Sequence, residues 1–289
     1  MNPYHHLVAE YARFAKEAKS YPLGSFSHPA RPTLPPDAPK VLIFSPHPDD
    51  ECIIGGLALR LLRQANWRVV NIAVTQGSNK ARQVERFVEL SHACDYLGFD
   101  LVQTRPGGLE GVNPKSRQQN SAAWHTMVDT IAAILGRHQP RVVLLPHERD
   151  WNSTHIGTHW LVMDALRSLS PAPDCFLIET EFWGQMDDPN LMVEINPADL
   201  ADLMTATSFH VGEVRRNPYH LLLPAWMQDN IRRGEELVGG QGQAAPDFTF
   251  ATLYRLRRWR QGGPERLYSG GKSLPANADP AGFLAGCGQ

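Results

Sequence analysis

Short apolar runs alternate with helical patterns between residues 40 and 180, and this alternation limits the possible folds more than any other feature. A run of four to six apolar residues is typical of a buried strand, whereas apolar residues three or four apart are typical of a helix. We expect strands at residues 41–44, 69–74, 99–103, 142–145 and 175–180, and helices at residues 55–64, 82–97, 124–135 and 160–169. This order predicts an α/β fold, with a Rossmann-like, mostly parallel sheet and helices on both faces.

The sequence on either side of this region has a different pattern. Residues 4–19 show helical spacing, and a proline-rich stretch follows at residues 28–36. Beyond about residue 205 the alternation fades: residues 248–256 fit either a strand or a helix, and the last twenty residues are expected to be poorly ordered. We therefore expect an N-terminal helical arm and linker over residues 1–38, an α/β core over 39–205, and a C-terminal extension over 206–289 that completes a substrate pocket.

The overall composition indicates a protein that recognises its ligand at a local site and not through a broad charged surface. The net charge is -2, which gives no reason to expect nucleic acid or an anionic membrane as a partner. The apolar run at residues 142–145 is too short to cross a bilayer, and no apolar leader follows Met1, so no stable membrane insertion is expected. The cysteines are scattered, without a CxxC pair, as in a reducing cytoplasm: Cys52, Cys94, Cys175 and Cys287.

The segment that points most directly to chemistry is residues 45–51, Ser-Pro-His-Pro-Asp-Asp-Glu. It follows the first expected strand and precedes a helix, and ligands bind at such strand ends in open α/β sheets. His47 and Asp50 are three residues apart on a turn, so they can hold one divalent metal such as Zn²⁺, while Asp49 stays free to act as a base. The alternative is that the acidic residues only cap the helix, which explains one carboxylate but not the whole run.

Two ligands leave a zinc site incomplete, so a third ligand must come from elsewhere in the chain. The strand expected at residues 142–145 leads into a segment that contains His147, His155 and His159. We expect His155 just before a helix and His159 one turn further along it. Their spacing alone does not choose between them.

Residues 45–51, with their strand and helix, resemble the signature of the PIG-L (LmbE-like) family of zinc-dependent N-deacetylases, which includes the GlcNAc-PI de-N-acetylases. The resemblance extends over about residues 40–180. Three further segments carry it: residues 74–78 are similar to a Thr-x-Gly loop, residues 86–98 to an Arg-x-x-Glu helix that ends in Leu-Gly, and residues 152–158 to a His-x-x-His region.

The resemblance implies His47 and Asp50 as metal ligands and Asp49 as the general base. It also implies His155 as the third ligand, because Thr158 follows three residues later, as in the family. Zn²⁺ is then the expected metal, with Fe²⁺ as the alternative.

One position departs from the family pattern. Asn152 stands where the family has the first histidine of His-x-x-His, which stabilises the oxyanion or protonates the leaving amine. An asparagine can donate a hydrogen bond to an oxyanion but cannot supply a proton. The general acid is therefore open between Asp49 and one of His147, His159 and His210.

Asp150, Arg86 and His210 each have two interpretations, one functional and one structural. Asp150 either orients a ligand histidine or caps the following turn. Arg86 either pairs with Glu89 on one helix face or binds substrate, and His210 is either a substrate-binding or a packed histidine. A basic run is expected to form a solvated face, with binding of an anionic sugar or phosphate as the alternative: Arg255, Arg257, Arg258 and Arg260.

Taken together, the residues and the resemblance imply a hydrolase that removes an N-acetyl group from an N-acetylglucosamine-like small molecule or glycoconjugate. The alternatives are a hydrolase of a non-sugar amide with the same metal site, and a catalytically silent sugar-binding or metal-binding protein. A nucleotide-binding enzyme is disfavoured because no G-x-G-x-x-G follows the first strand. A homo-oligomer is an open alternative to a single chain.

Overall fold

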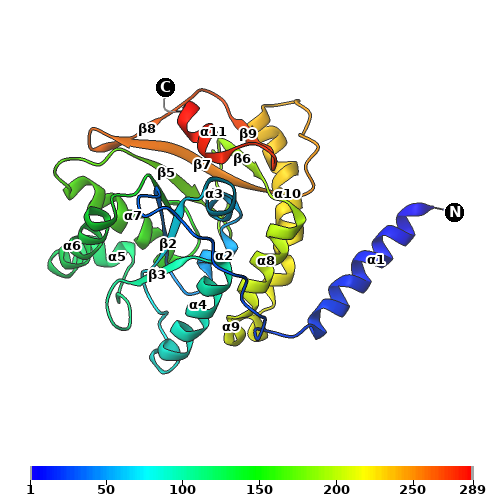
Figure 1. Ribbon diagram of the computed structural model, residues 1–289, viewed down its shortest axis with the longest axis horizontal. Coiled ribbons are helices and arrows are strands. Elements are labelled where there is room, and N and C mark those ends of the chain that lie inside the picture. Colours follow the sequence, from blue (N-terminus) through cyan, green and yellow to red (C-terminus); the bar gives the residue numbers. More distant parts are fainter. Residues whose placement is uncertain (1, 288–289) are drawn as a thin grey trace.

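A mixed β-sheet runs through the computed structural model, which describes residues 2–287 (Figure 1). Within these residues the strand order is β3-β2-β1-β4-β5-β7-β6-β9, and β8 pairs with β7. The strands are β1 (Lys40–Ser45), β2 (Arg68–Ala73), β3 (Asp100–Gln103), β4 (Val142–Pro146), β5 (Cys175–Thr180), β6 (Leu191–Glu194), β7 (Ala251–Arg260), β8 (Gly263–Arg266) and β9 (Lys272–Leu274). The predicted α/β class, with a mostly parallel sheet, is confirmed.

The parallel part of the sheet contains β3, β2, β1, β4 and β5. Val41 of β1 pairs with Val69 of β2 on one side and with Val142 of β4 on the other. Strands β2 and β3 lie on one side of β1, whereas β4 and β5 lie on its other side. The strand order therefore reverses between β1 and β4. A reversal of this kind opens a crevice at the carboxyl ends of the strands, where ligands bind in open α/β sheets.

Alternate residues of β1 lie in two different hydrophobic cores, one on each face of the sheet. Val41 and Ile43 pack with α3 (Leu57–Ala65), α4 (Gln83–Leu97) and α8 (Pro197–Ser208), whereas Leu42 and Phe44 pack with α6 (Ser121–His138) and α7 (Ser153–Ser168). Full burial of each such side chain stabilises the fold by roughly 1.5–3 kcal/mol. Helices therefore cover both faces, as the alternating sequence predicted.

The remaining helices complete the two layers and the arm. They are α1 (Pro3–Glu17), α2 (Asp50–Ile53), α5 (Pro114–Gln119), α9 (Val211–Arg216), α10 (Leu223–Gly234) and α11 (Pro280–Cys287). Helix α1 projects from the rest of the chain, and none of its residues is buried (Figure 1). In residues 2–287 no helix combines the length and the apolar character that crossing a membrane requires.

Helix α7 begins at Ser153 and not near residue 160, as expected from the sequence. Asn152 caps its first turn, where the Asn152 side chain accepts a hydrogen bond from the Thr154 amide at 2.8 Å. The first two turns carry polar residues, of which the fold buries His155, Thr158 and His159, so the apolar periodicity that marks a helix is missing there. His155 consequently lies inside the helix, not before it.

The expectation of a poorly ordered C-terminal end is wrong for the described residues. Helix α11 places Leu284 in the same core as α3, and β9 extends the sheet. The buried guanidinium of Arg60 binds four backbone carbonyl groups of this region, those of Leu274, Pro275, Ala276 and Ala278. These hydrogen bonds join residues more than 200 positions apart in the sequence, so no local sequence pattern predicts them. Residues 288 and 289 lie outside the described part.

The basic run also differs from the expected solvated face. Arg255 is buried in β7, where it bonds the carboxylates of Glu179, Glu148 and Asp188, and Arg258 binds Asp174. Strand β7 lies inside the sheet between β5 and β6, so these arginines meet acidic residues of neighbouring segments. Buried charges require such partners.

Candidate metal centre and catalytic cleft

The fold brings His47, Asp50 and His155 together at the crevice between β1 and β4. His47 Nδ1 lies 3.3 Å from His155 Nε2, and Asp50 Oδ2 lies 3.5 Å and 3.4 Å from those two atoms. Tetrahedral zinc with bonds of about 2.0–2.1 Å separates neighbouring ligand atoms by about 3.3 Å. The three atoms therefore already have the spacing of three corners of a zinc tetrahedron, and the donor set fits this metal.

The turn after β1 is shaped by its own acidic side chains. Asp50 Oδ2 accepts a hydrogen bond from the His47 amide at 2.8 Å, and Glu51 Oε2 accepts one from the Asp49 amide at 3.0 Å. No side chain caps α2. The acidic run therefore folds the turn and does not act as a helix cap.

Asp150 makes contacts that fit both interpretations left open by the sequence. Its Oδ2 lies 3.5 Å from His155 Nδ1, and its Oδ1 accepts a hydrogen bond from the Asn152 amide at 2.8 Å. A proton on Nδ1 directs the lone pair of His155 Nε2 toward Asp50 and His47, as in metal-ligating histidines. Burial lowers the pKa of His155, but the carboxylates of Asp50 and Asp150 outweigh this effect and raise it to about 9.

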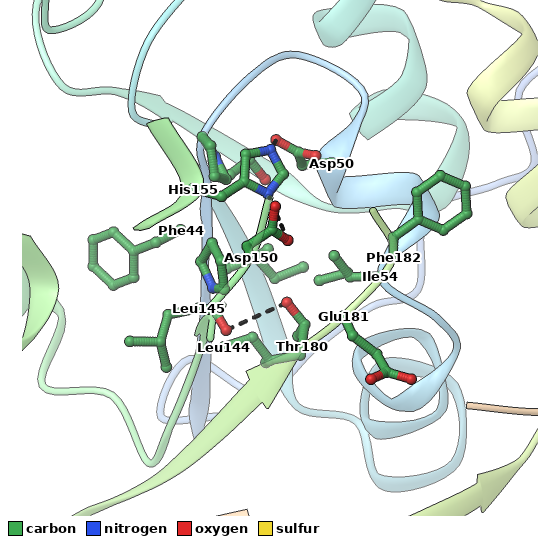
Figure 2. A pocket seen from close by; sticks show the side chains of 14 residues that line it. Phe44, Asp50, Ile54, Leu144, Leu145, Asp150, His155, Thr180, Glu181 and Phe182 are labelled. Carbon is green, nitrogen blue, oxygen red and sulfur yellow. Dashed lines mark hydrogen bonds and ion pairs between the residues drawn. The ribbon is translucent and has the colours of Figure 1, made fainter. Parts of the chain in front are cut away.

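Two of the candidate ligands, Asp50 and His155, lie above a largely apolar floor. Figure 2 shows Asp50 and His155 facing one another, with Asp150 below His155 and with Ile54, Leu144 and Leu145 beneath them. The cavity between these groups measures about 10 Å³, which is the space of about one water molecule. An apolar floor strengthens electrostatic interactions at the site because the local dielectric is low.

Asp49 is held in a backbone conformation that is unusual for a residue other than glycine, with φ of 115°. Besides the bond from the Asp49 amide, Glu51 interacts through Oε1 with His210 Nε2 at 2.7 Å. Both Glu51 and His210 are completely buried. Burial lowers the pKa of His210, and Glu51 outweighs this effect and raises it. The buried Glu51–His210 pair therefore holds the backbone of the turn at Asp49.

The carboxylate of Asp49 has two further neighbours. The hydroxyl group of Tyr219 donates a hydrogen bond to Asp49 Oδ2, and Arg86 Nη2 lies 3.9 Å from the same oxygen. Burial and the nearby Asp50 raise the pKa of Asp49 to about 6. Sequence reasoning missed Tyr219, because it lies 170 residues from Asp49 in a segment without a recognisable motif.

Arg86 reaches the turn across Gly77. A Cβ atom on Gly77 would lie 2.3 Å from Arg86 Nη1, and Gly77 has a φ of +82°, so any other residue here would be strained and would force the Arg86 side chain to move. Arg86 Nη2 donates to the Pro48 carbonyl group at 2.9 Å, whereas Glu89 accepts a hydrogen bond from the Gly212 amide at 2.9 Å. Arg86 thus faces the site instead of pairing with Glu89.

A cleft with two lobes opens beside these residues. His47, Gly77, Ser78 and Asn152 line both lobes. The smaller lobe, about 220 Å³, also contains Asp49, Arg86, Trp183, Glu213 and Arg216. The larger lobe, about 500 Å³, extends along residues 109–113 toward Lys80 and Gln83. Because Asn152 Oδ1 caps α7, its Nδ2 amide is the group that can donate into the cleft.

His147 and His159, two candidates for the general acid, make their contacts elsewhere and not with Asp49. His147 Nε2 contacts the Gly184 carbonyl group at 3.0 Å, and its Nδ1 accepts a hydrogen bond from the Arg149 amide. His159 Nδ1 contacts the Pro146 carbonyl group at 2.9 Å, and the same nitrogen lies 3.6 Å from Glu179. Burial lowers the pKa of His159. Both rings are therefore engaged with backbone away from the three candidate ligands.

Solved structures with this fold have low sequence identity to the chain. The conserved protein TT1542 from Thermus thermophilus has a TM-score of 0.56 and 20% identity, and the match covers 74% of this chain and 93% of that one. For N,N'-diacetylchitobiose deacetylase from Pyrococcus horikoshii the TM-score is 0.53 with 16% identity, over 86% and 91% of the two chains. No curated protein matches the sequence.

A third similar structure catalyses a different reaction. GalB, the 4-carboxy-2-hydroxymuconate hydratase from Pseudomonas putida, has a TM-score of 0.54 and 15% identity over 75% of this chain and 95% of that one. The fold alone therefore does not determine the reaction.

The match of the sequence itself is more informative than the fold. One family model, described as PIG-L: GlcNAc-PI de-N-acetylase, matches residues 42–166. This range includes the turn after β1, the Gly77 loop, Arg86 and the start of α7. The match shows that the chain carries a domain of the PIG-L family over these residues.

Proposed function

We propose that this protein is a zinc-dependent hydrolase that removes an acetyl group from the nitrogen of an N-acetylglucosamine-like substrate. One observation carries the proposal: the ligand atoms of His47, Asp50 and His155 have tetrahedral spacing beside the unligated carboxylate of Asp49. The PIG-L match supports the same class of reaction. Fe²⁺ is the alternative metal for this donor set.

A metal ion held by these residues would supply Lewis acidity for the amide carbonyl group and would make water more acidic. His47, Asp50 and His155 would hold the metal, and three protein ligands are typical of catalytic zinc sites. Asp150 holds His155 in the tautomer that such a site requires.

Asp49 is the proposed general base. Tyr219 donates a hydrogen bond to its Oδ2, and the Glu51–His210 pair fixes its backbone, so the carboxylate is oriented before substrate binds. Asn152 Nδ2 is the proposed donor to the developing oxyanion. Removal of such a donor typically lowers the rate about 100- to 1,000-fold.

The leaving amine needs a proton, and the carboxyl group of Asp49 is its proposed donor. His159 and His147 contact backbone carbonyl groups elsewhere, and His210 is bound to Glu51. We therefore propose that Asp49 takes the proton from water and gives it to the amine, instead of a separate histidine acid.

The charges around the cleft favour a neutral, hydroxyl-rich substrate. Lys80 pairs with Glu110 at 3.2 Å, and Arg216 pairs with Glu213. Because Lys80 and Arg216 are paired with carboxylates, the cleft presents polar groups but no net positive charge that would attract an anionic substrate. The segment 206–289 completes the pocket in this proposal, because Glu213 and Arg216 line the cleft and Tyr219 contacts Asp49.

The proposed location is the cytoplasm. All four cysteines carry free, buried thiols, which suits a reducing compartment.

The proposal is tested by measuring amine release from a panel of N-acetylated glucosamine conjugates by the zinc-loaded protein, with Asp49→Asn as the control. Release that disappears in the variant supports the proposal. If metal is bound but no sugar is deacetylated, the substrate is a non-sugar amide or the site only binds its ligand.

A further inference from the structure

A buried ion pair joins α10 to the loop that follows β5. Arg233 of α10 donates from Nη1 to Glu181 Oε1 and from Nη2 to Glu181 Oε2, and the Glu181 side chain is completely buried. Figure 2 shows the Glu181 carboxylate pointing away from Asp50 and His155, so the pair lies outside the candidate metal centre. Because desolvation of two charges offsets their attraction, a buried pair is weak evidence for stability and calls for another explanation.

The same two side chains close the loop formed by residues 181–186. Glu181 Oε2 accepts a hydrogen bond from the Met186 amide at 2.6 Å, and Arg233 Nη2 donates to the Met186 carbonyl group at 3.1 Å. Arg233 Nη1 also donates to Asn230 Oδ1 at 3.2 Å, within α10. A guanidinium holds several acceptors in one fixed plane, whereas an ammonium group is a compact charge on a flexible stem. Both ends of the loop are therefore fixed to each other and to α10.

The middle of this loop contacts the carboxylate that orients a candidate metal ligand. The Gly184 amide donates to Asp150 Oδ2 at 3.5 Å, and the same oxygen lies 3.5 Å from His155 Nδ1. The two backbones also touch, because a Cβ atom on Gly184 would lie 2.8 Å from Asp150 Cα. A shift of the loop would therefore move Asp150 relative to His155.

The residues before Gly184 contact the other side of the site. The ring of Trp183 packs edge-on against Tyr219 at 5.3 Å, and the Tyr219 hydroxyl group donates to Asp49. Phe182 packs edge-on against Trp226 of α10 at 5.1 Å. The loop thus contacts both the group that orients the candidate ligand and the group that orients the proposed base.

We propose that Arg233 is a positioning residue for the candidate catalytic centre. It fixes both ends of the 181–186 loop. The loop in turn keeps its Gly184 amide on Asp150 and its Trp183 ring on the tyrosine that binds the proposed base. The inference concerns the geometry of these groups, and it rests on the proposed function only where metal binding and turnover are measured.

The first test compares Arg233→Lys with the matched control Arg60→Lys. Both variants replace a buried arginine that binds backbone carbonyl groups and keep its positive charge, but the carbonyl groups bound by Arg60 belong to residues 194 and 274–278. Hydrogen exchange of backbone amides is followed by mass spectrometry on the metal-free proteins, so the result does not depend on the proposed reaction.

In Arg233→Lys the amides of residues 181–186 and 150–154 should exchange at least about tenfold faster, because a charged hydrogen bond is lost. Arg60→Lys should accelerate exchange only near the C-terminal segment. Glu181→Gln, which keeps the shape of the side chain, should act in the same direction as Arg233→Lys. Faster exchange at 181–186 with no change at 150–154, or no change at either segment, would overturn the proposal.

The second test measures zinc affinity by competition with a chelator. Arg233→Lys should weaken the affinity about tenfold, because a ligand whose orienting group moves binds metal less well. Arg60→Lys should bind zinc as the unchanged protein does. An equal loss in both variants would mean that Arg233 acts only through general stability, which would contradict the proposal.

Amine release from N-acetylated glucosamine conjugates is measured separately. If exchange and zinc affinity change as expected but the unchanged protein releases no amine, the proposed reaction fails and the positioning role stands. If the unchanged protein releases amine and Arg233→Lys matches it in exchange, zinc affinity and kcat, the positioning role fails and the reaction stands.

Discussion

His210 Nε2 lies 2.7 Å from Glu51 Oε1, and neither side chain is exposed to solvent. The contact joins the segment that follows α8 to the turn after β1, across 159 residues of sequence. Since the other oxygen of Glu51 accepts the Asp49 amide, the pair connects the C-terminal third of the chain to the backbone of the proposed base.

We expect His210→Ala to lower the free energy of unfolding by about 3 kcal/mol, because it leaves a buried carboxylate without its partner. It should also lower kcat while bound metal is retained, since no candidate metal ligand is removed. Urea unfolding and metal analysis check the two effects, with His125→Ala at an exposed position of α6 as the control. A loss of stability without a change in kcat would show that the pair is only structural.

His155→Ala should abolish most metal binding, whereas His159→Ala should keep it. His155 Nε2 faces His47 and Asp50, but His159 contacts the Pro146 carbonyl group. Metal content of the purified variants after loading with Zn²⁺ decides between them. The reverse result would make His159 the third ligand.

Asp150→Asn should weaken metal affinity about 10- to 100-fold without abolishing it, the usual effect of changing a group that orients a ligand. The asparagine can still accept the hydrogen bond from the Asn152 amide, so the loop should remain folded. Competition with a chelator measures the affinity. An unchanged affinity would mean that Asp150 acts only on the turn.

Tyr219→Phe should lower kcat about 10- to 100-fold, because a hydrogen bond to a charged group typically contributes about 1.5–3 kcal/mol. The ring and its contact with Trp183 remain, so KM should change little. Steady-state kinetics separates the two constants. If only KM rises, Tyr219 binds substrate and does not orient Asp49.

Glu148→Gln should destabilise the protein near neutral pH but not in acid. Burial raises the pKa of Glu148, and Arg255 outweighs this effect and lowers the pKa to about 2, below the usual value of about 4.3 in an unfolded chain. The stabilisation by the ionised group is therefore complete above about pH 4.3 and is lost as the pH falls toward about 2.

Urea midpoints of the two proteins between about pH 3 and 6 test this dependence. The difference between them should narrow below about pH 4.3. The exposed Glu236→Gln serves as the control. A difference that does not change with pH would show that the charge of Glu148 is unimportant.

Local sequence patterns predicted the elements that depend on local periodicity. The strands near residues 41–44 and 175–180 and the helix near residues 82–97 lie within a few residues of the expected positions. The start of α7 was misplaced because its first turns carry polar residues that the fold buries around the site.

The sequence by itself determined the α/β class, the PIG-L resemblance and the residues of the turn after β1, because these depend on periodicity and on neighbouring residues. The tertiary structure decided which distant groups meet that turn. Tyr219, His210 and the loop of Trp183 reach it only because β7 enters the sheet and the C-terminal segments fold over the strand ends. Contacts between groups more than 100 residues apart follow from packing of the whole chain, which no local pattern contains.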